Sequence, residues 1–224
     1  GLQLYENAIS EDLSRRVAAE MRSELERGRA GLLPGRTYTP VTGAFVARHQ
    51  SREQLQFGVY VHANRVEEKT EVAALPPVLL ECVEALIQAR VLSEPERTDC
   101  AVVNFYEPSD WVPAHIDNRK FERPFVILSV SSHTTMTFAP IEHEEGSMQD
   151  ETKVHHTLAL PARSALRLEG PSADEWTHAL PPAHEPRISI VFRRLLPPAP
   201  PPASQAESAA EAAEARVVRG VAAL

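Results

Sequence analysis

Apolar positions recur every four residues near the N-terminus, over residues 11–27. They are held by Leu13, Val17, Met21 and Leu25. Side chains at this spacing lie on one face of an α-helix, so the segment is expected to pack on a core. Ser10 precedes it as a helix-capping residue, followed by two acidic residues in the first turn. Gly28 and Gly31 are expected to end the helix.

A second helical pattern starts near Pro76 and Pro77 and runs through the segment VLLECVEALIQARVL. Its apolar positions follow the 3.6-residue period: Leu79, Cys82, Val83 and Leu86. Residues 35–65, between the two helices, contain short β-branched and aromatic runs with glycines between them. This composition predicts strands and loops.

From residue 100 the pattern changes to short runs separated by turn residues. The runs are CAVVNFY, FVILSVS, TMTFAP, VHHTLALP, SALRLEG and RISIVFRR. No segment of helical period interrupts them. Such a series is typical of an antiparallel sandwich or barrel. Residues 197–224 begin with PPAPPPASQ and become rich in Ala and Glu, which predicts an extended, unpacked tail.

Composition limits the functional classes only in part. The 224 residues suffice for one substantial domain, and two cysteines do not make a disulfide framework. We therefore expect a reducing intracellular setting, with no secretory leader and no membrane-spanning run. The formal net charge of −8 argues against a broadly basic nucleic-acid-binding surface, but not against a small basic rim.

The segment PAHIDN places a histidine and an aspartate two residues apart. In a strand, His115 and Asp117 would point to the same face. Two interpretations fit this pair. It supplies two ligands to one metal ion, or it is an ordinary hydrogen-bonded pair on a solvated strand.

A mononuclear iron site of the two-histidine, one-carboxylate type needs one more histidine from a later strand. The downstream candidates are His133, His143, His155, His156, His178 and His184. His178 is favoured because the strand RISIVFR follows it, with Arg187 and Arg193 on one face. A guanidinium there can hold a carboxylate in bidentate fashion. Asn104 and Tyr106 share a face of an earlier strand and can hydrogen-bond the same ligand.

The order N-x-Y, H-x-D, H, R-x5-R resembles the AlkB branch of the iron(II)/2-oxoglutarate dioxygenases. The segments VVNFYEPSDWVPAHIDNRKFERPFVILSVSS and SADEWTHALPPAHEPRISIVFRR are similar to the eukaryotic subgroup that removes N6-methyl groups from adenine in RNA. FERP, ADE-x-x-H and the QFG near residue 57 also fit that subgroup. The resemblance covers roughly residues 50–195.

The resemblance implies an α+β fold with a double-stranded β-helix (jelly-roll) core and flanking N-terminal helices. Residues 1–75 would form the N-terminal helix and a nucleotide-recognition lid. Residues 76–196 would form the support helix and the dioxygenase core, and residues 197–224 a disordered Pro/Ala-rich tail.

The resemblance also assigns roles to residues. His115, Asp117 and His178 would bind Fe(II), while Asn104, Tyr106, Arg187 and Arg193 would hold 2-oxoglutarate. Arg193 would also lie near the target base and count among the catalytic residues. O2 is the third reactant.

Substrate contacts are expected from two regions. The lid offers Arg52, Gln54, Gln56 and Tyr60, where Gln54 stands at a position that animal relatives give to a lysine. A basic rim after the H-x-D pair, formed by Arg119, Lys120 and Arg123 with Arg193 and Arg194 opposite, would guide the phosphates.

The leading hypothesis is therefore an oxidative demethylase of N6-methyladenine in single-stranded RNA, which releases formaldehyde, succinate and CO2. One alternative keeps this mechanism for another substrate: alkylated DNA, another RNA base or a protein. The other alternative is a non-catalytic module that binds methylated RNA. We expect a monomer located in the nucleus, the cytoplasm or both.

Overall fold

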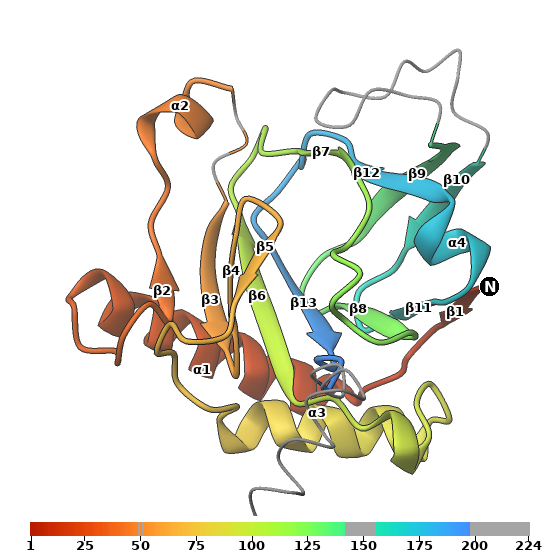
Figure 1. The fold of residues 1–224 in the computed structure, drawn as a ribbon, viewed down its shortest axis with the longest axis horizontal. Coiled ribbons are helices and arrows are strands. Elements are labelled where there is room, and N and C mark those ends of the chain that lie inside the picture. The colour runs from red at the N-terminus through yellow and green to blue at the C-terminus, as the bar shows by residue number, and fades with distance from the viewer. Residues whose placement is uncertain (49, 51, 142–155, 198–224) are drawn as a thin grey trace, which may run out of the picture.

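The computed structural model describes residues 1–48, 50, 52–141 and 156–197. Two antiparallel sheets dominate the fold (Figure 1). The large sheet has the strand order β1-β11-β8-β13-β6-β3-β2, and the small sheet has the order β10-β9-β12-β7. A separate hairpin is formed by β4 and β5. The paired sheets confirm the predicted jelly-roll core.

The strands of the large sheet are β1 (Leu2–Tyr5), β2 (Tyr38–Thr39), β3 (Glu53–Phe57), β6 (Cys100–Tyr106), β8 (Phe125–Ser129), β11 (Ala165–Leu168) and β13 (Arg187–Arg193). Those of the small sheet are β7 (Val112–His115), β9 (Thr134–Pro140), β10 (His156–Leu160) and β12 (Trp176–Leu180). The hairpin comprises β4 (Tyr60–His62) and β5 (Arg65–Glu67). The helices are α1 (Glu11–Arg29), α2 (Gly43–Val46), α3 (Pro77–Gln88), α4 (Pro171–Asp174) and a 3-10 turn, η1 (Glu94–Glu96).

Helix α1 follows its predicted pattern closely. The side chain of Ser10 caps it by accepting a hydrogen bond from the Leu13 backbone N–H at 3.1 Å. All four apolar positions at the four-residue spacing are buried. The prediction that Gly28 helps to end the helix is wrong, because α1 continues to Arg29. Gly31, with φ of +72°, lies just beyond the end, as predicted.

Helix α3 buries the predicted face but is shorter than its pattern. It ends at Gln88, because Arg90 adopts a left-handed φ of 59° that turns the chain. Val91 and Leu92 follow this turn and are still buried, so their apolar character reflects packing rather than helix.

Two hydrophobic layers hold the elements together. The first lies between helices α1 and α3 and the outer face of the large sheet, below which both helices run (Figure 1). The second lies between the two sheets and includes the large buried side chains of Phe125 and Phe138. Strand β6 is buried along nearly its whole length, and it pairs with β13 on one side and β3 on the other. Alternate side chains of β6 and β13 therefore point between the sheets at fixed positions, and the others pack toward the helices.

Residues 1–75 share the large sheet with the core, because β1 pairs with β11 and β3 pairs with β6. Strand β1 was not predicted, because LQLY is too short to indicate a strand by itself and its partner β11 lies about 160 positions later. The short helix α4 also interrupts the strand series that the sequence predicts to be unbroken. None of the described helices combines the length and apolar character that a membrane span needs. The tail from residue 198 lies outside the described residues.

Gly28 is a close-approach site that yields a stability prediction. A Cβ there would lie 2.7 Å from the Cβ of Tyr38 and 2.9 Å from its Cγ. Gly28→Ala should therefore destabilise the protein by about 1 kcal/mol in urea unfolding, because overpacking outweighs the gain in helix propensity. Ser23→Ala, on the exposed face of the same helix, is the matched control and should not destabilise. A more stable Gly28→Ala variant would contradict this packing.

Candidate active site

Three potential metal ligands converge at the edge between β7 and β12. His115 ends β7 and pairs in register with His178 of β12. Their ring centroids are 4.3 Å apart. Asp117 follows two residues after His115, and its Oδ1 lies 3.7 Å from the His115 Nε2. One donor atom from each of the three residues lies within 4.8 Å of the others.

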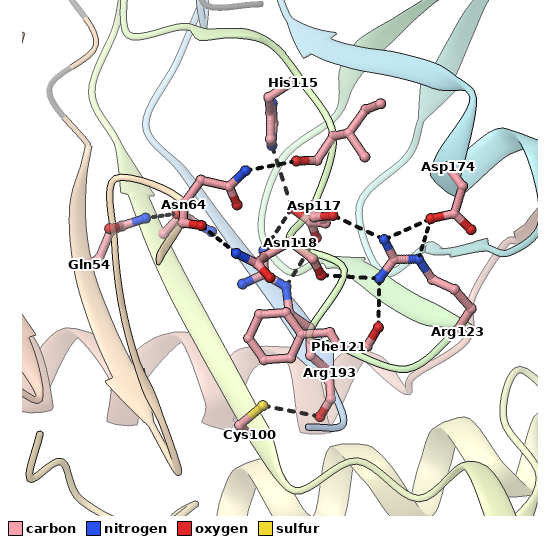
Figure 2. Close-up of polar contacts among 12 residues, drawn as sticks. Gln54, Asn64, Cys100, His115, Asp117, Asn118, Phe121, Arg123, Asp174 and Arg193 are labelled. Atoms are coloured by element: carbon pink, nitrogen blue, oxygen red, sulfur yellow. Dashed lines mark hydrogen bonds and ion pairs between the residues drawn. The ribbon is translucent and has the colours of Figure 1, made fainter. Parts of the chain in front are cut away.

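Neighbouring groups orient these ligands. The Nδ1 of His115 lies 2.8 Å from the Pro113 carbonyl oxygen, so Nδ1 carries the proton and Nε2 keeps a free lone pair. Arg193 donates two hydrogen bonds to the Asp117 carboxylate, from Nε to Oδ2 and from Nη2 to Oδ1, each at 3.0 Å. Figure 2 shows this pair below His115.

The electrostatics set the protonation states that a metal requires. Burial lowers the pKa of His178 to about 3, with a further contribution from His115, and burial also lowers the pKa of His115. Burial by itself would raise the pKa of Asp117, but the positive charge of the Arg193 guanidinium beside it brings the pKa down to about 2. At neutral pH the site therefore offers two neutral imidazoles and one carboxylate.

This donor set fits the iron site predicted from the sequence. Two histidines and one carboxylate on one side leave the opposite side for other ligands, which is the arrangement of non-haem Fe(II) oxygenases. The buried Nδ1 of His178 has no hydrogen-bond partner among the described residues, so this nitrogen is a potential donor to an ion.

Arg187 is a buried arginine whose guanidinium is only partly hydrogen-bonded among the described residues. Its side chain is 3% exposed, and Nη2 donates to the Ser129 Oγ at 3.1 Å. Within the described residues, Nε and Nη1 have no hydrogen-bond partner. Burial lowers the pKa of this guanidinium, and the neighbouring Tyr106 offsets part of that effect. A buried cation with two free donors fits a bidentate carboxylate ligand such as one end of 2-oxoglutarate.

Strand β6 carries the two other predicted cosubstrate residues. Tyr106 lies opposite Arg187 in the sheet register, with its ring 5.1 Å from the guanidinium carbon. Asn104 is buried, and its Oδ1 accepts hydrogen bonds from Arg52 at 3.1 Å and from Gln54 at 2.7 Å. The Asn104 oxygen is thus engaged, which leaves its amide N–H groups as the donors toward a ligand.

Some of the lid candidates extend toward the cosubstrate residues, and the others are engaged in packing and hydrogen bonds within the lid. Arg52 and Gln54 reach the site through Asn104. Gln56 does not, because its amide bonds Thr39 and the backbone of Val61 and fixes the start of the β4–β5 hairpin. Tyr60 is buried, with the Arg36 guanidinium 5.5 Å from its ring.

The predicted basic rim is largely neutralised. Lys120 pairs with Glu68 at 3.0 Å, and Arg194 lies 3.4 Å from Glu122. Arg123 pairs with Asp174 at 3.1 Å. Arg119 is exposed, and among the described residues it donates to the Asp174 carbonyl, at 3.3 Å. Of the rim residues, Arg119 is therefore the one without a carboxylate partner in the described structure.

The remaining histidine candidates lie away from the cluster. His133, His156 and His184 are exposed, and His133 lies 3.7 Å from Glu185. His143 and His155 fall outside the described residues. Trp111 donates to the Arg48 carbonyl at 2.6 Å, which ties the segment after α2 to β7.

Two asparagines near the ligands were missed by the sequence reasoning. Asn64, at the hairpin turn, donates to the carbonyl of Ile116 at 3.4 Å, and Asn118 donates to the Asn64 carbonyl (Figure 2). Ala63 and Asn64 both have positive φ, so HANR is a tight hairpin turn. That turn signal was readable, but its docking beside the H-x-D pair was not.

Comparison with known proteins gives the same result as the geometry. Residues 1–209 match the family model of the 2OG-Fe(II) oxygenase superfamily. RNA demethylase ALKBH9B of Arabidopsis thaliana is 32% identical over 203 residues, which cover 87% of this chain and 39% of the relative. The mouse protein named tRNA (carboxymethyluridine(34)-5-O)-methyltransferase ALKBH8 is 30% identical over 137 residues, covering 60% and 19% respectively. The chain thus spans about two fifths or less of these relatives.

The solved structure of OsALKBH1 superimposes with a TM-score of 0.60 at 16% identity, covering 87% of this chain and 98% of that one. At this identity the likeness concerns the fold. The family match spans nearly the whole chain and includes the histidines, the aspartate and the buried arginine. This protein belongs to the 2OG-Fe(II) oxygenase superfamily, whose members use Fe(II), 2-oxoglutarate and O2.

Proposed function

We propose that the protein is an oxidative demethylase of N6-methyladenine in single-stranded RNA. The observation that carries the proposal is a complete ligand set within a chain that is 32% identical to a protein named RNA demethylase. The three metal-binding side chains and the cosubstrate arginine are all present and oriented. This completeness disfavours a purely binding module.

In the proposed reaction, bound Fe(II) with 2-oxoglutarate and O2 supplies the oxidant that hydroxylates the N-methyl carbon, from which formaldehyde is released. His115, Asp117 and His178 would hold the metal, and Arg187 would hold one carboxylate of 2-oxoglutarate. Asn104 would donate its amide N–H groups to the same ligand. Arg193 keeps Asp117 ionised and in place.

An unpaired base enters such a pocket most readily, which favours a single strand. Arg52 and Gln54 are the lid residues that extend to the site through Asn104. We assign them to substrate or cosubstrate positioning, with Arg119 as the rim cation still available for a phosphate. Gln56 and Arg123 are engaged within the protein and are not assigned to RNA.

The substrate is tested by mass spectrometry of a short single-stranded RNA that carries one N6-methyladenine. We expect loss of one methyl group, dependent on Fe(II) and 2-oxoglutarate, and slower loss from a matched DNA. Consumption of 2-oxoglutarate without demethylation of the RNA would reject the base and keep the oxygenase chemistry. A panel of other methylated oligonucleotides would then locate the substrate.

The metal ligands are tested with alanine variants in which turnover and the free energy of unfolding are measured separately. His115→Ala should abolish succinate formation and leave the unfolding midpoint nearly unchanged, because this side chain is partly exposed. Asp117→Ala should abolish turnover and also destabilise the fold by about 3–5 kcal/mol, because Arg193 loses its buried partner. Succinate can be followed by NMR and stability by urea unfolding. Retained turnover in either variant would exclude that residue as a ligand.

Arg187 is tested by a substitution that removes the buried charge and keeps the volume. Arg187→Met should raise the half-saturating concentration of 2-oxoglutarate at least about 30-fold, because a buried charge pair contributes 2 kcal/mol or more. The ligand-free variant should melt no lower than the parent protein, since two unpaired donors are removed. The thermal shift on adding 2-oxoglutarate should disappear. An unchanged 2-oxoglutarate requirement would assign the carboxylate to another residue.

A further inference from the structure

Arg123 lies beside the metal cluster without contacting the three ligand side chains through its guanidinium. Its side chain is 14% exposed, and all five N–H groups are used. Nε and Nη2 donate to the Asp174 Oδ1, at 3.3 and 3.1 Å. Nη2 also donates to the carbonyl of Asp117 at 3.0 Å. Nη1 donates to the carbonyls of Asn118 and Phe121, at 3.4 and 3.0 Å.

These bonds join two segments that carry metal ligands. Asp117 lies beyond the end of β7, so no strand pairing fixes its backbone. Asp174 ends α4, four positions before His178 in β12. The pairing of β7 with β12 has an irregular register between His178 and Leu180. The register pairing of His115 with His178 positions the two histidines. The Arg123 guanidinium connects the Asp117 loop to the segment that leads to His178 (Figure 2).

A ring contact gives Arg123 a second connection to the site. Its guanidinium carbon lies 5.3 Å from the centre of the Phe125 ring. Phe125 is fully buried, and its ring centroid is 6.0 Å from that of His178. Arg123 and His178 thus both lie close to the same buried ring, that of Phe125.

We propose that the Arg123–Asp174 ion pair is a positioning device for the metal centre, which holds the Asp117 loop and the His178 segment at the separation that metal binding needs. This assignment replaces the phosphate contact predicted for Arg123 from the sequence. It rests on the metal-centre part of the proposed function and does not depend on the methylated base. Arg123 and Asp174 are positioning residues, because neither side chain donates an atom to the metal.

Lysine cannot replace Arg123 in this role. Its ammonium has three donors at one point, whereas the guanidinium plane reaches three carbonyl oxygens and one carboxylate oxygen in different directions. Arg123→Lys keeps the charge and removes the geometry. Asp174→Ala removes the acceptor and leaves the bonds to the loop carbonyls.

The test is Mn(II) binding to the metal-free full chain, followed by electron paramagnetic resonance of the free ion, with Mn(II) as a redox-stable substitute for Fe(II). Loss of groups that support metal ligands typically weakens metal affinity 10- to 100-fold. We expect an increase of Kd in this range for Arg123→Lys and for Asp174→Ala. The double variant should be no weaker than the worse single variant by more than about threefold, because both changes break the same connection.

Glu122→Gln is the matched control. Glu122 neighbours Arg123 and pairs with Arg194 at 3.4 Å, but that pair contacts neither ligand-bearing segment. Its Kd for Mn(II) should stay within about twofold of the parent value. Thermal unfolding of each metal-free variant separates a general loss of stability from a loss of metal affinity.

The outcomes are distinct. Weaker Mn(II) binding in both variants, with the control unchanged, supports the positioning role. Lower melting temperatures with unchanged Mn(II) affinity would overturn it, since the pair would then support only the fold. If Arg123→Lys does not fold, Asp174→Ala decides alone. Failure of the parent protein to bind Mn(II) would overturn the metal centre together with this inference, whereas failure to demethylate RNA would leave the inference intact.

Discussion

The contact between Asp117 and Arg193 is the constraint on which the site depends. A carboxylate 5% exposed in the space between two sheets is costly unless a cation compensates it at close range. Arg193 supplies that cation at the end of β13, a central strand paired on both sides. The pair keeps Asp117 ionised without a metal, while burial keeps the two histidines neutral. The ligands are therefore in their binding protonation states before an ion arrives.

Arg187, at the other end of β13, carries the same charge as Arg193 but has no carboxylate to compensate it in the described structure. It is as deeply buried as His178, but no carboxylate faces it among the described residues. The same strand thus carries one arginine whose charge the protein compensates and one whose charge it leaves for a ligand. They are six positions apart, so alternation puts both on the same face. The R-x5-R motif therefore places two arginines on one strand face: Arg193, which is paired with Asp117, and Arg187, which faces no carboxylate in the described structure.

The sequence predicted the elements in which apolar residues recur at a short, regular spacing. Helices α1 and α3 and strand β6 follow from apolar spacing, and the metal ligands follow from H-x-D and a later histidine. Residues held by distant partners were not predictable in this way. Strand β1 exists because it pairs with β11, and Asn64 reaches Ile116 because a hairpin folds over the site. Arg123 was predicted to contact phosphate, because its ion-pair partner Asp174 lies 51 positions later in the chain.

The neutralised rim changes how an acidic protein would meet RNA. Affinity for a phosphate backbone comes from cations that release counterions, and a cation already paired with a carboxylate contributes little. Lys120, Arg123, Arg193 and Arg194 are all paired in this way. Arg36, Arg48 and Arg65, from residues 36–65, have no carboxylate partner within the described structure. Contacts to the RNA backbone would then come from these lid arginines, next to Arg52 and Gln54, and from Arg119 on the rim. Under the proposed function, the lid is therefore where we expect a strand of RNA to lie next to the cosubstrate site.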